Sequence, residues 1–251
     1  TYQSKQIFYR DIGTGKPVLM LHGNTASSVM LELLLPLYQK NFKVILMDFL
    51  GNGQSDGLKK FPSDVWISQS KQVIGLIEHL NYKNVKLIGT SGGAWTAVNA
   101  AMERPDLIES VVADSFDGRT LADDFAENLH AERAFAKKDK NARQFYEWCQ
   151  GKDWEQVVDA DTKALVECAQ KKMPLFQKPL ERLSVPVLFM GSMEDTMVRK
   201  DLAEEYEQMR QRVPNGYVHL FPKGGHPAIM TNAKASALLI MDFLNGRTEK
   251  L

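Results

Sequence analysis

Apolar positions along this chain follow two alternating patterns, one typical of buried strands and one typical of helices. Short, mostly apolar runs occur at 4–12, 18–21, 43–47, 85–88, 107–113, 186–190 and 217–221, and several have the uniformly apolar character of strands buried on both faces. Between them, apolar side chains recur at helical spacing in 27–39, 63–80, 94–102, 199–211 and 233–244. Such alternation predicts an α/β fold with a mostly parallel, doubly wound sheet and helices on both faces.

The alternation stops between residues 115 and 184, where helical patterns alone remain. We expect helices at 121–138, 142–150, 154–158 and 162–173. We therefore predict a helical cap, residues 115–184, above a core domain made of residues 1–114 and 185–251. The cap carries Phe135, Trp148, Met173 and Phe176, which are candidates for lining a substrate pocket. The alternative is that such apolar stripes hold the cap's own helices together.

Composition and charge narrow the possible functions. The 251 residues are 44% hydrophobic and 25% charged, and 31 basic residues balance 31 acidic ones. A net charge of zero gives no reason to expect attraction to nucleic acid or to an anionic membrane. No apolar run approaches membrane-spanning length and no signal segment opens the chain. The chain begins at Thr1, which leaves a removed leader open.

The two cysteines, Cys149 and Cys168, form no Cys-x-x-Cys pair and have no histidine at ligand spacing. We expect reduced thiols, and therefore a cytoplasmic protein, and no metal site. A glycine-bearing loop at 51–56 has the pattern Gly-x-Gly-x-x-Asp. It lacks the third glycine of a dinucleotide fingerprint and no helix pattern follows it directly, so a tight surface turn is the better interpretation.

The most informative motif is Gly89-Thr90-Ser91-Gly92-Gly93, which follows an apolar run and precedes a small-residue helical segment. Strand, tight turn and helix in that order form the context of a nucleophile elbow. A bulky side chain two positions before or after the apex would collide there, and glycine avoids the collision. Ser91 is thus a candidate nucleophile.

Polar residues that directly follow predicted strands are His22, Asp48, Ser91, Asp114, Asp195 and His226. The carboxyl ends of parallel strands share one edge of the sheet, where sites are built. A serine hydroxyl needs a base, and a carboxylate orients that base. His226 is the predicted base, because serine, acid and histidine follow one another in that order in elbow folds. Asp195 is the predicted acid, with Glu194 and Asp114 as alternatives.

The remaining histidines suit other roles. His79, His130 and His219 fall inside predicted elements, and His22 is better placed to shape its loop than to accept a proton.

Acyl chemistry also requires donors for the developing oxyanion. The backbone N–H of Gly92, at the start of a helix, is one candidate. The loop after His22-Gly23 should supply the other, from Asn24 or, second, from Thr25.

These motifs together resemble the α/β-hydrolase fold superfamily over nearly the whole chain. The residues that carry the resemblance are His22-Gly23-Asn24, the loop 48–55, Gly89–Gly93, 195–198 and Gly225-His226. The resemblance implies an eight-stranded, mostly parallel sheet under a helical cap, a Ser-His-acid triad and no cofactor.

The chain also departs from familiar members of that superfamily. Thr90 stands where many lipase-like and C–C-bond-cleaving members carry His, and the acid lies four places after Gly191 rather than three. The loop at Asn24 is similar to the oxyanion loop of haloalkane dehalogenases, but those carry Asp where this chain has Ser91. The elbow also lacks the Gly-Gly-Ser-Trp-Gly of proline iminopeptidases.

The sequence accordingly predicts a serine hydrolase that acts on a small, largely apolar carboxylic ester as a monomer or homodimer. The expected partner is a small-molecule acyl substrate. Two alternatives stay open: hydrolysis of another acyl bond (amide, thioester, lactone or C–C), and a slow-turnover ligand receptor or signalling protein that retains the fold.

Overall fold

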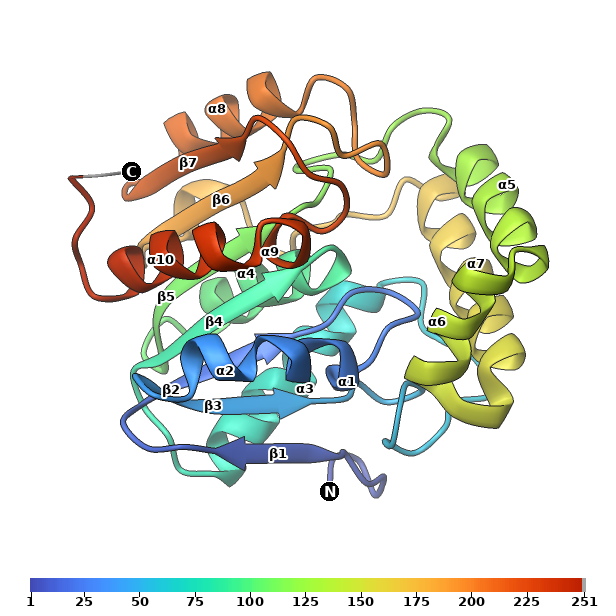
Figure 1. The fold of residues 1–251 in the computed structure, drawn as a ribbon, viewed down its shortest axis with the longest axis horizontal. Helices are drawn as coiled ribbons and strands as arrows, with labels where there is room; N and C mark the ends of the chain where they lie inside the picture. The colour runs from blue at the N-terminus through green and yellow to red at the C-terminus, as the bar shows by residue number, and fades with distance from the viewer. Residues whose placement is uncertain (250–251) are drawn as a thin grey trace.

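The computed structural model describes residues 1–249. It contains one seven-stranded sheet in the order β1-β3-β2-β4-β5-β6-β7, in which only the edge strand β1 runs antiparallel to its neighbour (Figure 1). The strands are β1 (Tyr9–Ile12), β2 (Lys16–Leu21), β3 (Phe42–Met47), β4 (Val85–Thr90), β5 (Ile108–Asp114), β6 (Val187–Ser192) and β7 (Gly216–Phe221). The predicted mostly parallel α/β sheet is confirmed.

Helices cover both faces of this sheet. They are α1 (Ser28–Leu31), α2 (Leu35–Tyr38), α3 (Val65–His79), α4 (Gly92–Glu103), α5 (Phe125–Lys138), α6 (Lys140–Gln150), α7 (Trp154–Gln170), α8 (Leu202–Arg212), α9 (Ala228–Thr231) and α10 (Ala233–Leu244). Successive side chains of a strand point to opposite faces. In β2, Leu19 and Leu21 therefore join the core under α3, α4 and α8, while Val18 and Met20 join the core under α1, α2 and α10.

Three sequence expectations need correction. The sheet has seven strands in the described residues, one for each predicted apolar run, rather than the eight that the family resemblance implies, and the strand expected at 4–12 begins only at Tyr9. The helix expected at 27–39 is split into α1, a 3-10 turn and α2, with Pro36 in the first turn of α2, where a missing N–H does no harm. The two helices expected at 154–158 and 162–173 are one continuous helix, α7.

Helices α5, α6 and α7 (residues 125–170), here called the helical insertion, lie beyond the carboxyl ends of the parallel strands (Figure 1). They hold together partly through a small core of their own around Ala136, Tyr146 and Val158. The Tyr146 and Trp154 rings stack with centroids 5.9 Å apart. None of the helices in residues 1–249 is both long enough and apolar enough to cross a bilayer.

Candidate active site

Ser91 occupies the sharp turn between β4 and α4. Its backbone has φ 54° and ψ −125°, a conformation that non-glycine residues rarely adopt and that tends to mark functional positions. A Cβ atom on Gly89 would lie 2.0 Å from the Gly93 carbonyl oxygen, and one on Gly93 would lie 2.5 Å from the Leu21 carbonyl oxygen. The two glycines are therefore required by backbone packing around Ser91, as the sequence motif suggests.

His226 and Asp195 meet at the same edge of the sheet. His226 lies in the loop after β7 and Asp195 in the loop after β6, and the His226 Nδ1 atom is 2.8 Å from Asp195 Oδ2. The other carboxylate oxygen of Asp195 accepts a hydrogen bond from the Met197 N–H at 2.9 Å. A carboxylate at Nδ1 selects the tautomer that leaves Nε2 free to accept a proton.

The two alternative acids lie in different surroundings. Asp114, at the end of β5, is fully buried, and its Oδ2 accepts hydrogen bonds from Thr90 Oγ1 and the Ile229 N–H. Burial raises the pKa of Asp114 to about 6, although these hydrogen bonds oppose the rise. Glu194 is exposed and accepts a hydrogen bond from the Gly224 N–H at 3.3 Å. Within residues 1–249, Asp195 is the acid that hydrogen-bonds to His226.

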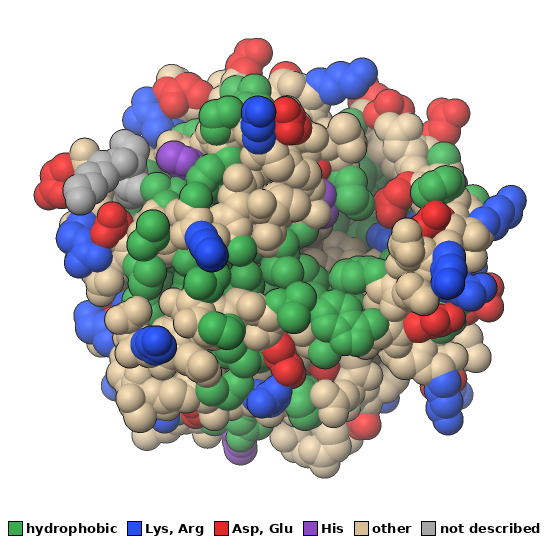
Figure 2. All heavy atoms as spheres, viewed as in Figure 1, with side chains coloured by type: hydrophobic (Ala, Val, Ile, Leu, Met, Phe, Trp, Pro, Cys, Tyr) green, Lys and Arg blue, Asp and Glu red, His purple; other side chains and the backbone are tan. Residues whose placement is uncertain are grey.

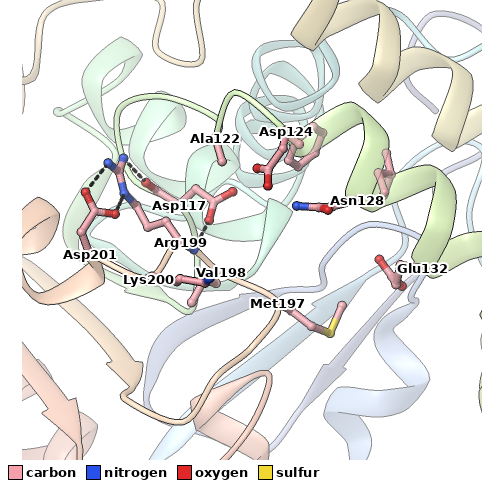
Figure 3. A pocket seen from close by; sticks show the side chains of 12 residues that line it. Asp117, Ala122, Asp124, Asn128, Glu132, Met197, Val198, Arg199, Lys200 and Asp201 are labelled. Atoms are coloured by element: carbon pink, nitrogen blue, oxygen red, sulfur yellow. Dashed lines mark hydrogen bonds and ion pairs between the residues drawn. The ribbon is translucent and has the colours of Figure 1, made fainter.

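A cavity of about 390 Å³, with several charged side chains in its wall, lies beside the loop that carries Asp195. Figure 3 shows Arg199 beside Asp117 and Asp201 on one side of this cavity. The Arg199 N–H donates to Asp117 Oδ1 at 2.8 Å, and the Arg199 guanidinium also binds Asp201. Burial raises the pKa of Asp117 to about 6, opposed by the Arg199 N–H and charge. These contacts fasten the loop after Asp195 to the segment after β5.

Ser91 and His226 line a common cavity of about 510 Å³ between the sheet and the helical insertion. Figure 2 shows a hollow edged by hydrophobic side chains on this face of the molecule. Its walls include Met30, Phe145 and Trp148. A narrower space of about 80 Å³, also lined by Ser91 and His226, lies against Trp66, Trp95, Phe116 and Leu165. The nucleophile candidate therefore faces one large compartment and one small one.

The four predicted pocket residues are placed differently from one another. Trp148 lines the larger cavity, whereas Phe135 is 68% exposed and is not among the residues around it. Met173 and Phe176 pack against the main hydrophobic core. The structure thus brings Trp148 to the site and places the other three elsewhere.

The loop after β2 presents a free backbone donor next to Ser91. The His22 Nδ1 atom lies 2.8 Å from the Gly23 carbonyl oxygen, while His22 Nε2 accepts from the Phe49 N–H. Because the peptide unit is planar and trans, fixing the Gly23 carbonyl aims the Asn24 N–H the opposite way. No acceptor in residues 1–249 contacts that N–H. Gly92 is the first residue of α4, so its N–H has no partner inside the helix.

The His22 imidazole is enclosed, and burial lowers its pKa. Both ring nitrogens are engaged, as expected of a residue that shapes its loop.

In the described part of the chain, no group of three or more His, Cys, Asp or Glu side chains could hold a metal ion.

Comparison with known proteins identifies the family. The sequence matches the family model described as "alpha/beta hydrolase fold" over residues 16–167. The chain belongs to the alpha/beta hydrolase fold family.

Several known proteins resemble the chain in sequence or structure. It is 26% identical to the serine hydrolase BPHL of Mus musculus over 95% of this chain and 82% of that protein. It is 36% identical to the 2-(acetamidomethylene)succinate hydrolase of Mesorhizobium japonicum over 43% of this chain, a match that spans only 38% of that relative. An esterase structure from Exiguobacterium antarcticum superposes with a TM-score of 0.76 at 19% identity, covering 97% of both chains. That likeness shows the fold.

Sequence reasoning missed several polar residues of this alpha/beta hydrolase that surround the loop after β2. They are Trp66 on α3, Arg133 on α5, Gln150 on α6 and Asp161 on α7. A signal existed for Asp161, which falls on the same face of α7 as the buried Val158, Leu165 and Cys168. A carboxylate on an apolar stripe is rare unless it is paired.

Proposed function

We propose that this protein is a serine hydrolase that cleaves a small, largely apolar carboxylic ester through an acyl-enzyme. The observation that carries the proposal is the strained backbone of Ser91 beside a cavity that it shares with His226, whose Nδ1 lies 2.8 Å from Asp195. A serine on a strained turn that shares a cavity with an oriented imidazole is the arrangement expected of a serine nucleophile and its base.

The reaction follows the serine-hydrolase sequence of steps. Ser91 Oγ attacks the ester carbonyl carbon while His226 Nε2 takes the hydroxyl proton, and Asp195 stabilises the resulting imidazolium. The N–H groups of Gly92 and Asn24 bind the oxyanion. Collapse expels the alcohol, which receives the proton from His226. Water then attacks the acyl-enzyme with His226 as base, releasing the acid and restoring Ser91.

The two compartments favour an ester with one small substituent. The space of about 80 Å³ beside Trp95 and Leu165 has room for a group of only a few carbons. The larger cavity, with Met30, Phe145 and Trp148 in its walls, suits a bulkier apolar group. We propose that the helical insertion acts as the cap over this pocket. The mouse relative's name, a serine hydrolase, agrees with this chemistry.

Steady-state hydrolysis of p-nitrophenyl acetate and p-nitrophenyl butyrate tests the proposal. The enzyme is expected to release many equivalents of p-nitrophenolate, and Ser91→Ala is expected to release none above the solution background. A burst of a single equivalent followed by tight product retention would favour the receptor alternative. Preference for an anilide, thioester or lactone over the ester would redirect the proposal to another acyl bond.

A further inference from the structure

The loop after β2 is attached to all three helices of the helical insertion. Asn24 bonds to Asp161 on α7, Thr25 to Arg133 on α5, and the Ala26 carbonyl to Gln150 on α6. Each contact joins residues more than a hundred positions apart in the chain. Three successive residues, here called the oxyanion loop (residues 24–26), are thus each held by a different helix.

The Asn24 side chain is fully committed to this arrangement. Its Nδ2 donates to Asp161 Oδ2 at 2.9 Å, and its Oδ1 accepts from Trp66 Nε1 at 3.0 Å. A Cβ atom on Gly92 would lie 2.0 Å from Asn24 Oδ1. The amide therefore packs directly on the start of α4, and the oxyanion donor of Asn24 is its backbone N–H rather than its side chain.

The strained backbone of Thr25 requires stabilising contacts from outside the loop. It has φ 55°, a left-handed conformation that is a genuine outlier for a β-branched residue. Arg133 Nη1 donates to Thr25 Oγ1 at 2.7 Å, and Thr25 Oγ1 donates to the Asn24 carbonyl oxygen at 2.6 Å. The same Nη1 also donates to the Tyr146 hydroxyl at 2.6 Å. This relay fixes the peptide unit that follows Asn24.

Gln150 closes the third contact. Its Nε2 donates to the Ala26 carbonyl at 2.8 Å and to Asn52 Oδ1 at 3.2 Å, and its Oε1 accepts from the Gly53 N–H at 2.7 Å. One amide thereby joins α6, the oxyanion loop and the loop after β3.

The charged pair in this network is a poor stabiliser of the fold. Arg133 and Asp161 are both buried, yet their nearest recorded approach is 3.8 Å. Within residues 1–249, Arg133 Nε and Asp161 Oδ1 have no hydrogen-bond partner. The desolvation of two buried charges can cost more free energy than their attraction returns when the geometry is not ideal. The well-formed contacts of the pair are its hydrogen bonds to Asn24, to Thr25 and to the Tyr146 hydroxyl. Two of these three contacts reach the oxyanion loop, which points to a role in shaping it.

We infer that Asp161, Arg133 and Gln150 are positioning residues, which hold the oxyanion loop in the conformation that binds the oxyanion. This inference rests on the proposed function and assigns a second role to the helical insertion. Docking of α5, α6 and α7 against the core completes the oxyanion site as well as covering the pocket. A helical insertion that moves away should therefore slow acylation of Ser91 even where substrate still binds.

Asp161 offers the sharpest test, because two substitutions separate its hydrogen bond from its charge. Asp161→Ala removes the acceptor for Asn24 and should lower kcat for p-nitrophenyl butyrate by about 10- to 100-fold with little change in KM. Asp161→Asn keeps an acceptor oxygen and should recover most of kcat. Asp159→Ala, on the same helix, breaks only an exposed ion pair with Lys137 and should leave kcat unchanged.

A double-mutant cycle with Asn24→Ala tests the connection itself. If Asp161 acts through the Asn24 side chain, Asp161→Ala causes no further loss of kcat in the Asn24→Ala background. Fully additive losses, or an Asp161→Asn variant as impaired as Asp161→Ala, would overturn the inference and leave Asp161 as a structural ion-pair partner.

Hydrogen exchange keeps the inference testable apart from the proposed function. Backbone amides of residues 24–28 should exchange faster in Asp161→Ala than in the wild type, while amides of the central strands stay protected. Unchanged exchange in the loop would contradict the inference whatever the activity. Absence of Ser91-dependent turnover in the wild type would instead refute the proposed function.

Discussion

The Nδ1 atom of His226 lies 2.8 Å from Oδ2 of Asp195, although the two residues belong to different loops. Parallel pairing of β6 with β7 brings these loops together, because both loops leave the sheet at its carboxyl edge. In the proposed mechanism, this hydrogen bond sets the tautomer of the base.

Replacing Asp195 by Asn should lower kcat by about 10⁴-fold, because an amide can donate to Nδ1 and would select the wrong tautomer. The matched control is Glu194→Gln, which alters the neighbouring carboxylate that binds the Gly224 N–H. We expect kcat of the Glu194→Gln control to stay within a few-fold of the wild-type value. Steady-state ester hydrolysis measures both variants, and the opposite ranking would make Glu194 the acid.

Gly89→Ala should destabilise the protein by about 3 kcal/mol or more, because the added Cβ would meet backbone rather than a movable side chain. For a chain of this size that corresponds to a fall in Tm of roughly 10 °C. Gly57→Ala, where nothing lies within 4 Å of the added Cβ, should change Tm by about 1 °C or less. Calorimetry compares the two, and equal Tm values would argue against the tight elbow.

Asp114 should make the protein less stable as pH rises. Its pKa is about 6 in the folded chain against an ordinary value of 3.8, so the unfolded state loses the proton first. The free energy of unfolding therefore falls between about pH 4 and pH 6, by up to about 3 kcal/mol from this group. Asp114→Asn should flatten this part of the profile, as measured by urea unfolding across that range. The pKa of Asp117 is similarly raised, so part of the pH dependence of unfolding should remain in Asp114→Asn. Identical slopes in wild type and variant would contradict the prediction.

Trp148→Ala should raise KM for p-nitrophenyl butyrate by about five-fold while kcat changes little. Trp148 lines the larger cavity, and loss of its apolar contact removes roughly 1 kcal/mol of substrate binding. Phe135→Ala is the control, because Phe135 is 68% exposed and lies away from that cavity. A larger effect at Phe135 than at Trp148 would show that the substrate occupies a different surface.

The sequence was sufficient to predict the fold class because parallel strands buried on both faces leave uniformly apolar runs. The family match confirms the resemblance that those runs and their loops suggested. The need for glycine at position 89 was equally predictable, since a Cβ there would collide with the Gly93 carbonyl oxygen inside the same short motif, whereas Gly93 avoids the Leu21 carbonyl oxygen on β2. A steric constraint between residues close in the sequence can be predicted from a short motif. The roles of Ser91, His226 and Asp195 stay predictions.

Side-chain contacts between residues distant in the sequence could not be predicted in the same way. The apolar stripe of α5 could not show that Phe135 faces solvent while Arg133, two positions earlier, is buried, because that depends on where α7 packs. The hydrogen bond from Asn24 to Asp161 joins positions 137 residues apart, and no local sequence pattern predicts such a pair. Side chains that act through tertiary contacts appear only once the helices are placed.

The most direct test of the account is the site of covalent labelling by a fluorophosphonate, located by peptide mass spectrometry and compared with ester turnover. The account predicts one adduct, on Ser91, that abolishes turnover, and an unlabelled, folded Ser91→Ala variant whose kcat is lower by about 10⁴-fold or more. An adduct on another residue, or a Ser91→Ala variant that turns over ester at a rate close to that of the wild type, would contradict it.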